Sequence, residues 1–129
     1  MNEITDHHDG YGLNESITIK ALDEPGPGGA HHLYVAVIKA KNADGVEDEI
    51  EVARVQFQKG PRNEPGSTPG VTHMAMAALL LHPLRAFQEG PFKSRLNALV
   101  ITALEEALNW MHARARDRAQ RGVLGHLKP

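Results

Sequence analysis

The chain of 129 residues contains no cysteine. This absence excludes disulfide frameworks, thiolate zinc sites, iron–sulfur clusters and cysteine nucleophiles, and it fits a reducing cytoplasm. No apolar run approaches the roughly 20 residues that a membrane span requires, and the first residues lack the basic and apolar regions of a signal peptide. We therefore expect a soluble protein that acts in the cytoplasm and has no membrane partner.

Aromatic residues are scarce, at 5%, but the hydrophobic content of 41% and the charged content of 23% are ordinary for a globular protein. Charge is uneven along the chain: residues 1–71 hold twelve acids and six bases, whereas residues 72–129 hold four acids and eight bases. A basic region within a mildly acidic chain favours a small anionic ligand over duplex nucleic acid. We expect no nucleic-acid partner.

The first half of the chain has the pattern of about three antiparallel strands. Ile17 and Ile19 alternate with polar residues in a short strand. Residues 32–41 carry apolar side chains on both parities, which predicts a central strand covered on both faces. A third strand runs from residue 50 to residue 57, and its parity changes near Ala53, as a β-bulge would cause.

The second half has the pattern of a helical hairpin. A glycine- and proline-rich loop at residues 60–70 separates the two halves, Thr72 and Ser94 are candidate N-caps, and Gly90 with Pro91 ends the first helix. The fold class is therefore α+β, a small N-terminal antiparallel sheet followed by a two-helix antiparallel hairpin. We divide the chain into a polar arm (1–14), a β subdomain with its loop (15–71) and the hairpin (72–129).

Three arginines near the end of the second helix share one side of it. Arg114, Arg118 and Arg121 follow each other at i, i+4 and i+7. Arginine pairs with phosphate oxygens in a bidentate manner and keeps its charge, so this stripe suits a pyrophosphate or a phosphodiester. The alternative is an ordinary solvated helix end whose cations complement the helix dipole.

Aromatic and amide side chains gather at the turn between the helices. Phe87 and Phe92 flank this turn, and Asn97 lies in the first turn of the second helix. An aromatic face can stack on a purine, and an asparagine amide can both donate to and accept from an adenine edge. The alternative is that the phenylalanines fill the packing and that the asparagine supports the helix start.

The sequence offers no recognisable catalytic or metal-binding apparatus. The eight histidines occur as adjacent pairs or scattered singles, without a carboxylate at ligand spacing. Glu105 and Glu106 are neighbours on a helix, so their side chains diverge by about 100° and form no acid–base pair. A nucleophile elbow, a phosphate-loop motif and a dinucleotide fingerprint are all missing. We expect no catalytic residue, metal or cofactor.

An ordered set of segments resembles the phage Thoeris anti-defence sponge proteins. The set comprises Phe57–Pro61, Gly70–Thr72, Leu84–Gln88, Leu104–Met111 and the arginines that end in Arg121–Val123. It covers roughly residues 31–126, and the helical half carries most of it. The hairpin is also similar to that of anti-CBASS sponge proteins.

The resemblance implies a non-catalytic binding protein. Known members of that family bind cyclic ADP-ribose isomers made by defence TIR-domain proteins and keep them from the effector. This implies that the chain sequesters glycocyclic ADP-ribose in the host cytoplasm during phage infection and blocks Thoeris signalling. Two alternatives stay open from the residues, an enzyme that cleaves the signal nucleotide and a small nucleic-acid-binding regulator.

The resemblance also implies roles for individual residues. Phe87 corresponds to the family's purine-stacking aromatic residue and Asn97 to its base-reading asparagine, while Arg114 and Arg118 bind phosphate and ribose and Arg62 closes the pocket. Family members form dimers through the hairpin, and some form hexamers, as trimers of dimers, with further pockets for cyclic di- or trinucleotides. Asn97 and Arg114 lie 17 positions apart, about 25 Å along one helix. We therefore expect a homo-oligomer in which two subunits build each pocket.

Overall fold

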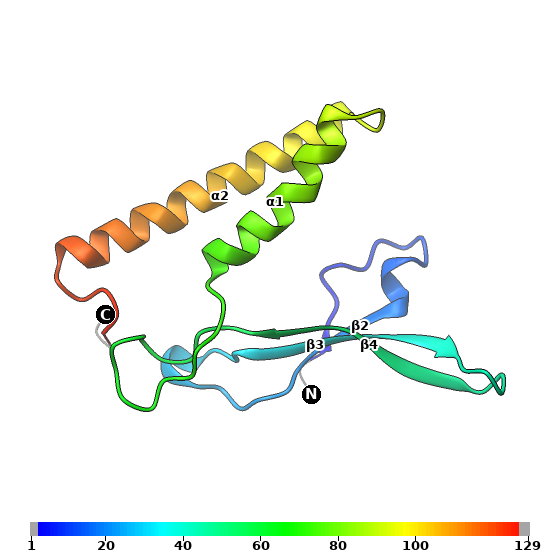
Figure 1. Cartoon of the computed structure of the whole chain (residues 1–129), viewed down its shortest axis with the longest axis horizontal. Coiled ribbons are helices and arrows are strands. Elements are labelled where there is room, and N and C mark those ends of the chain that lie inside the picture. Colours follow the sequence, from blue (N-terminus) through cyan, green and yellow to red (C-terminus); the bar gives the residue numbers. More distant parts are fainter. Residues whose placement is uncertain (1–2, 127–129) are drawn as a thin grey trace. The chain divides into compact units, whose positions relative to one another are not determined.

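A computed structural model describes residues 3–126 of the chain. These residues divide into two compact units (Figure 1). One unit contains residues 3–60 and 68–70 and holds the sheet, and the other contains residues 61–67 and 71–126 and holds the helices. The α+β class and the order of sheet before hairpin are confirmed.

The sheet has four antiparallel strands rather than the three expected, in the order β1-β2-β3-β4. The strands are β1 (Glu3–Ile4), β2 (Ile17–Ala21), β3 (Leu33–Lys41) and β4 (Glu47–Gln56), with short 3₁₀ turns η1 (Asn14–Ser16) and η2 (Pro27–Gly29) beside them. The additional strand, β1, pairs Glu3 with Lys20 and Ile4 with Ile19. Two residues are too few to show an alternating pattern, which is why the sequence did not reveal this strand.

The hairpin between β3 and β4 turns at Asn42 and Gly45. The side chain of Asn42 accepts hydrogen bonds from the N–H groups of Asp44 and Val46, and Gly45 takes the left-handed conformation (φ 74°) that the turn needs. Along the strands the register shifts between Ala36, which pairs with Ala53, and Val37, which pairs with Glu51. The bulge expected near Ala53 is therefore confirmed.

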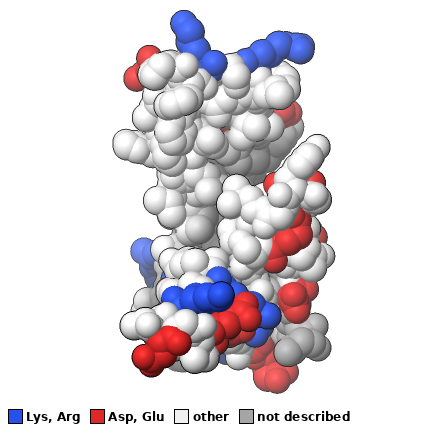
Figure 2. All heavy atoms as spheres, turned by 90° about the vertical axis from the view of Figure 1, so that its right-hand side faces the viewer, with Lys and Arg blue, Asp and Glu red and all other residues white. Residues whose placement is uncertain are grey.

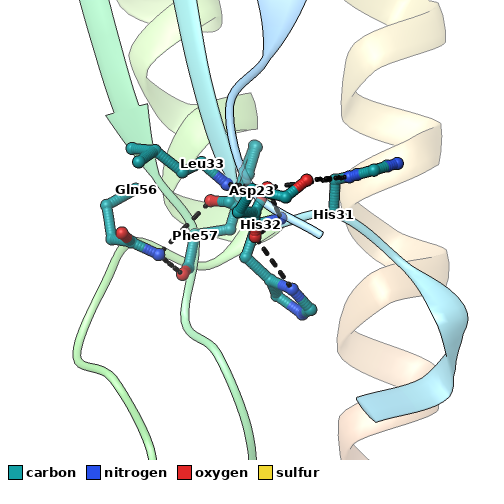
Figure 3. Close-up of polar contacts among 6 residues, drawn as sticks. All are labelled: Asp23, His31, His32, Leu33, Gln56 and Phe57. Carbon is teal, nitrogen blue, oxygen red and sulfur yellow. Dashed lines mark hydrogen bonds and ion pairs between the residues drawn. The ribbon is translucent and has the colours of Figure 1, made fainter. Parts of the chain in front are cut away.

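Asp23 fixes the start of β3 (Figure 3). Its carboxylate accepts the N–H groups of His32, at 2.9 Å, and Leu33, at 3.1 Å. Partial burial disfavours the ionised form of Asp23, but the N–H groups of Leu33 and His32 outweigh it and lower the pKa. The carbonyl of His32 accepts the N–H of Phe57 at 2.7 Å. These contacts join the loop before β3 to the end of β4.

The helical unit is an antiparallel pair, α1 (His73–Glu89) and α2 (Arg95–Gln120). Both predicted N-caps are confirmed, because Thr72 accepts the N–H of Ala75 and Ser94 accepts the N–H of Asn97, each at 3.0 Å. The two helices pack against each other, and Leu81 of α1, 1% exposed, is the most completely buried side chain described.

Few apolar side chains are buried in the single chain. Within residues 3–126 the buried hydrophobic residues are Val35 of β3 and Ala77 and Leu81 of α1. Residues 33–38 of β3 are half-buried or buried on both parities, so both faces of this strand are partly covered in one copy of the chain, and Val35 alone in this strand is buried. Many large apolar side chains of the described residues remain in contact with solvent, and most of them lie in the helical unit, on the helices or in their loops.

Candidate functional site

The turn between α1 and α2 is held together by Gln88. The side-chain amide of Gln88 donates through Nε2 to the carbonyl oxygen of Ser94, at 3.0 Å, and accepts at Oε1 the N–H of Ser94, at 3.2 Å. One side chain at the end of α1 thus bonds both backbone groups of the N-cap of α2. Sequence reasoning did not single out Gln88, and its place just before the helix stop is the only signal that could have done so.

Asn97 is attached to the same turn. Its Nδ2 donates to the carbonyl oxygen of Leu84, at 3.1 Å, and to Oε1 of Gln88, at 2.9 Å. The residue is half-buried. Its side chain therefore has a fixed position between the last two turns of α1 and the first turn of α2.

Exposed aromatic rings accompany this amide pair. Phe87, next to Gln88 in α1, is 54% exposed, and Phe92 in the turn is 78% exposed. The packing alternative therefore does not describe either ring in the single chain. The hairpin tip, defined as Phe87, Gln88, Phe92 and Asn97, offers apolar ring surface beside a fixed amide, which suits stacking and edge recognition of a planar base.

The predicted arginines lie toward the other end of the hairpin. Arg118 is half-buried and donates through Nη2 to the carbonyl oxygens of Val123, at 3.2 Å, and His126, at 2.9 Å. Arg62 is exposed and precedes Asn63, whose N–H donates to the carbonyl of Gly125 at 3.0 Å, so the 61–67 segment is attached to the same C-terminal turn. These residues, with Arg114, form the hairpin base.

The arginines of the predicted stripe differ in their surroundings. Arg114 is exposed and makes neither a hydrogen bond nor an ion pair with any residue between 3 and 126. Arg121 pairs with the carboxylate of Asp117 at 3.1 Å. Arg114 thus has no partner among residues 3–126, whereas the charge of Arg121 is partly compensated by its neighbour.

The structure brings together some of the predicted residues and separates others. Asn97 is bonded to Gln88, the neighbour of Phe87 in α1, so both predicted residues belong to the tip, whereas Arg62 and Arg118 adjoin the C-terminal turn at the base. Seventeen positions separate Asn97 from Arg114 in the continuous helix α2, which corresponds to about 25 Å. One hairpin therefore cannot place its tip and its base on the same small ligand.

An apolar stripe, exposed except at the half-buried Ala107, connects the two ends along α2. Its members follow at i, i+4, i+7, i+11 and i+14, which is one side of a helix: Leu96, Val100, Ala103, Ala107 and Trp110. Leu96 is 73% exposed and Trp110 is 69% exposed. Arg114 continues the stripe at i+18. Figure 2 shows one face of the molecule, where basic side chains lie at the upper end and again in the lower part beside most of the acidic ones, and the surface between them is largely uncharged.

The part of the chain that the structure describes lacks two kinds of feature. No group of three histidine or acidic side chains there is arranged to hold a metal ion. None of the helices within residues 3–126 combines the length and apolar character of a membrane span.

Comparison with known proteins identifies the hairpin. A family model for the Acb2/Tad1 hairpin domain matches residues 49–116, more than half of the chain. The protein "Thoeris anti-defense 1" of Bacillus phage SBSphiJ7 is 44% identical over 75 residues, which make up 58% of this chain and 52% of that protein. The chain thus matches about half the length of this relative. It belongs to the Acb2/Tad1 hairpin-domain family.

Proposed function

We propose that the protein binds a cyclic ADP-ribose-type signalling nucleotide, glycocyclic ADP-ribose, and sequesters it without cleaving it. In this role it counteracts Thoeris anti-phage signalling. The name of the relative from phage SBSphiJ7, which is 44% identical over 75 residues, supports the anti-defence context, and the family model that matches residues 49–116 spans α1 and most of α2. The chemistry of the tip and the base supports the class of ligand.

The two ends of the hairpin have complementary chemistry for such a ligand. Phe87 supplies a ring face for adenine, and Asn97 supplies a fixed polar atom for the base edge. Arg114, Arg118 and Arg62 supply guanidinium groups for the pyrophosphate and the riboses. A cyclic dinucleotide-like molecule carries the adenine, the pyrophosphate and the riboses within one compact ring.

The observation that carries the proposal is the separation of tip and base along one hairpin with an apolar stripe between them. Two hairpins that pack antiparallel through their stripes would place the tip of each beside the base of the other. The pairing would also bury Leu96 and Trp110, which a single chain leaves exposed. We therefore propose a homodimer through the hairpin, with each pocket built from two subunits. A hexamer, as a trimer of dimers, is the larger assembly that would add pockets for cyclic di- or trinucleotides.

Sequestration rather than catalysis fits the residues of both ends. Phenylalanine and asparagine do not transfer protons, and arginine stays protonated, so none of the five residues assigned to the site can act as a general base. To compete with a receptor for the signal, the protein needs a dissociation constant of about 1 nM, or about −12 kcal/mol. Two desolvated arginine–phosphate pairs, one stacked adenine and a preorganised dimer are sufficient to reach this affinity.

Calorimetry with glycocyclic ADP-ribose tests the proposal. We expect tight binding by the wild type, recovery of the intact ligand by chromatography after the complex is denatured by heat, and loss of at least about 100-fold in affinity for Phe87→Ala and for Arg114→Ala. Arg116→Ala is the matched control, because Arg116 is exposed on the same helix outside the stripe.

The other outcomes separate the competing functions. Recovery of an altered ligand would indicate an enzyme. Absence of binding, together with salt-dependent binding to DNA or RNA, would indicate a nucleic-acid-binding regulator. Unchanged affinity in both site variants would remove the residue assignment.

A further inference from the structure

The orientation of the Gln88 amide is determined by backbone atoms. Ser94 offers one N–H, which can only donate, and one carbonyl oxygen, which can only accept. Oε1 of Gln88 faces the N–H at 3.2 Å and Nε2 faces the carbonyl at 3.0 Å. The reversed amide would place two donors together and two acceptors together. Hydrogen bonding therefore permits only this orientation.

The orientation of the Asn97 amide follows from that of Gln88. Its Nδ2 lies 3.1 Å from the carbonyl oxygen of Leu84 and 2.9 Å from Oε1 of Gln88. Both partners are acceptors, so each of the two N–H groups of Asn97 has a partner inside the hairpin. A flipped Asn97 would set its own oxygen against two other oxygens, which costs free energy.

What remains of Asn97 for a ligand is its carbonyl oxygen. Oδ1 makes no hydrogen bond with residues 3–126, and it is not one of the buried side-chain atoms without a partner, which in this part of the chain are Nδ1 of His7 and Nδ1 of His32. Oδ1 is thus not fully buried, and it belongs to the same tip as the exposed Phe87. Asn97 presents an acceptor and no donor.

We infer that the base bound at the tip is recognised through an N–H donor, its exocyclic amine, and that Gln88 is the positioning residue that makes Asn97 an acceptor. This inference rests on the proposed function. Each polar edge of adenine pairs the 6-amino donor with a ring-nitrogen acceptor. An unrestrained asparagine amide would bond to both the 6-amino group and a ring nitrogen, as the sequence analysis expects. With both N–H groups engaged in the hairpin, Asn97 bonds to the amine alone.

Three analogues of glycocyclic ADP-ribose test this on the wild-type protein. One carries purine, which lacks only the amine, and the other two carry 1-deazaadenine and 7-deazaadenine, which each lack one ring acceptor and keep the amine. We expect the purine analogue to bind about 10- to 100-fold more weakly than the parent, since Oδ1 then loses its donor. We expect both deaza analogues to bind within about threefold of the parent, because no donor faces the ring nitrogens.

A variant then tests the role of Gln88. Gln88→Met keeps the length of the side chain and removes its amide, which frees one N–H of Asn97. We expect at least one deaza analogue to become about tenfold weaker than the parent in this variant, because the freed N–H now bonds to a ring nitrogen. A purely structural loss would weaken all the ligands equally. Glu89→Gln, at the neighbouring exposed position, should retain the wild-type ratios.

The outcomes distinguish the inference from the function beneath it. If the parent binds but the purine analogue and a deaza analogue lose equal affinity, sequestration stands and the acceptor-only assignment is overturned. Full-strength binding of the purine analogue would overturn that assignment as well. Wild-type ratios in Gln88→Met would overturn the role of Gln88. Failure of the parent ligand itself to bind would overturn the proposed function and this inference together. The measurements of the analogues on the wild-type protein do not depend on the folding of any variant.

Discussion

Glu15 shows how a single carboxylate organises a loop in the β unit. Its two oxygens accept the N–H groups of Asp9 and Gly12, each at 2.6 Å, and of Gly10, at 3.1 Å. These bonds, led by that of Gly10, lower the pKa of Glu15 from 4.5 to about 2, against a smaller opposing effect of desolvation. Hydrogen bonds to backbone N–H groups favour the ionised form.

This pKa predicts a pH dependence of the loop. Because the folded pKa is lower than the unfolded one, ionised Glu15 stabilises the loop fully above about pH 4.5, and the contribution is lost as the pH falls toward 2. In an NMR titration the amide signals of Gly10 and Gly12 should shift with a midpoint near pH 2, and Glu15→Gln should abolish that transition. Glu24→Gln, at an exposed carboxylate elsewhere, should retain it. A midpoint near 4.5 would contradict the bonded arrangement.

The sequence indicated which residues belong to the candidate site, but it did not indicate which of them bond to each other. Scarce phenylalanines beside a turn and arginines at helical spacing are visible in the sequence. The bonds of Asn97 to Leu84 and Gln88 span 13 and 9 positions. They exist only when the turn brings α1 and α2 together, so no local pattern shows them. For the same reason the sequence could not indicate which atoms of Asn97 remain for a ligand.

At the scale of elements, the contact between α1 and α2 depends on a small number of side chains. Leu81 is 1% exposed, whereas Leu79, on the opposite side of the same helix, is 63% exposed. We expect Leu81→Ala to lower the free energy of unfolding by about 2–5 kcal/mol, through lost burial and the cavity left behind. Chemical denaturation followed by circular dichroism would measure it.

Leu79→Ala is the matched control for this prediction, since it removes the same atoms from an exposed position. We expect a change within about 0.5 kcal/mol. Equal losses in the two variants would mean that Leu81 does not carry the packing between the helices.

The boundaries of the helices and strands follow from local sequence signals. The burial of their side chains does not. Thr72 and Ser94 cap the helices as their residue types predict, and the parity change at Ala53 marks the bulge. Hydrophobic pattern alone does not state which partner covers a side chain. Leu96 and Leu99 belong to the broad apolar side of α2, yet both are exposed, because α1 covers only part of that side.

At the scale of the whole molecule, the exposed stripe of α2 predicts how copies of the chain associate. Ala103 lies in the middle of the stripe, and Thr102 is its exposed neighbour on another side of the helix. We expect Ala103→Glu to raise the dimer dissociation constant at least about tenfold, since the new charge would be buried without a partner. Sedimentation velocity should show monomer at concentrations where the wild type is dimeric.

Thr102→Glu adds the same charge outside the stripe and should sediment like the wild type. If a pocket needs two subunits, Ala103→Glu should also lose affinity for glycocyclic ADP-ribose while Thr102→Glu keeps it. Identical sedimentation of the two variants would place the contact between copies elsewhere on the chain.

The last strand of the sheet has a consequence for aggregation. β4 stands at the end of the strand order, and its acidic residues are Glu47, Asp48, Glu49 and Glu51. An open strand edge is a template for pairing with identical strands, the step that starts amyloid-like growth. Two such edges meeting would bring like charges together, which opposes pairing at neutral pH. The acidic edge thus opposes pairing between the β4 strands of two copies, a property that the proposed sequestration would require at high protein concentration.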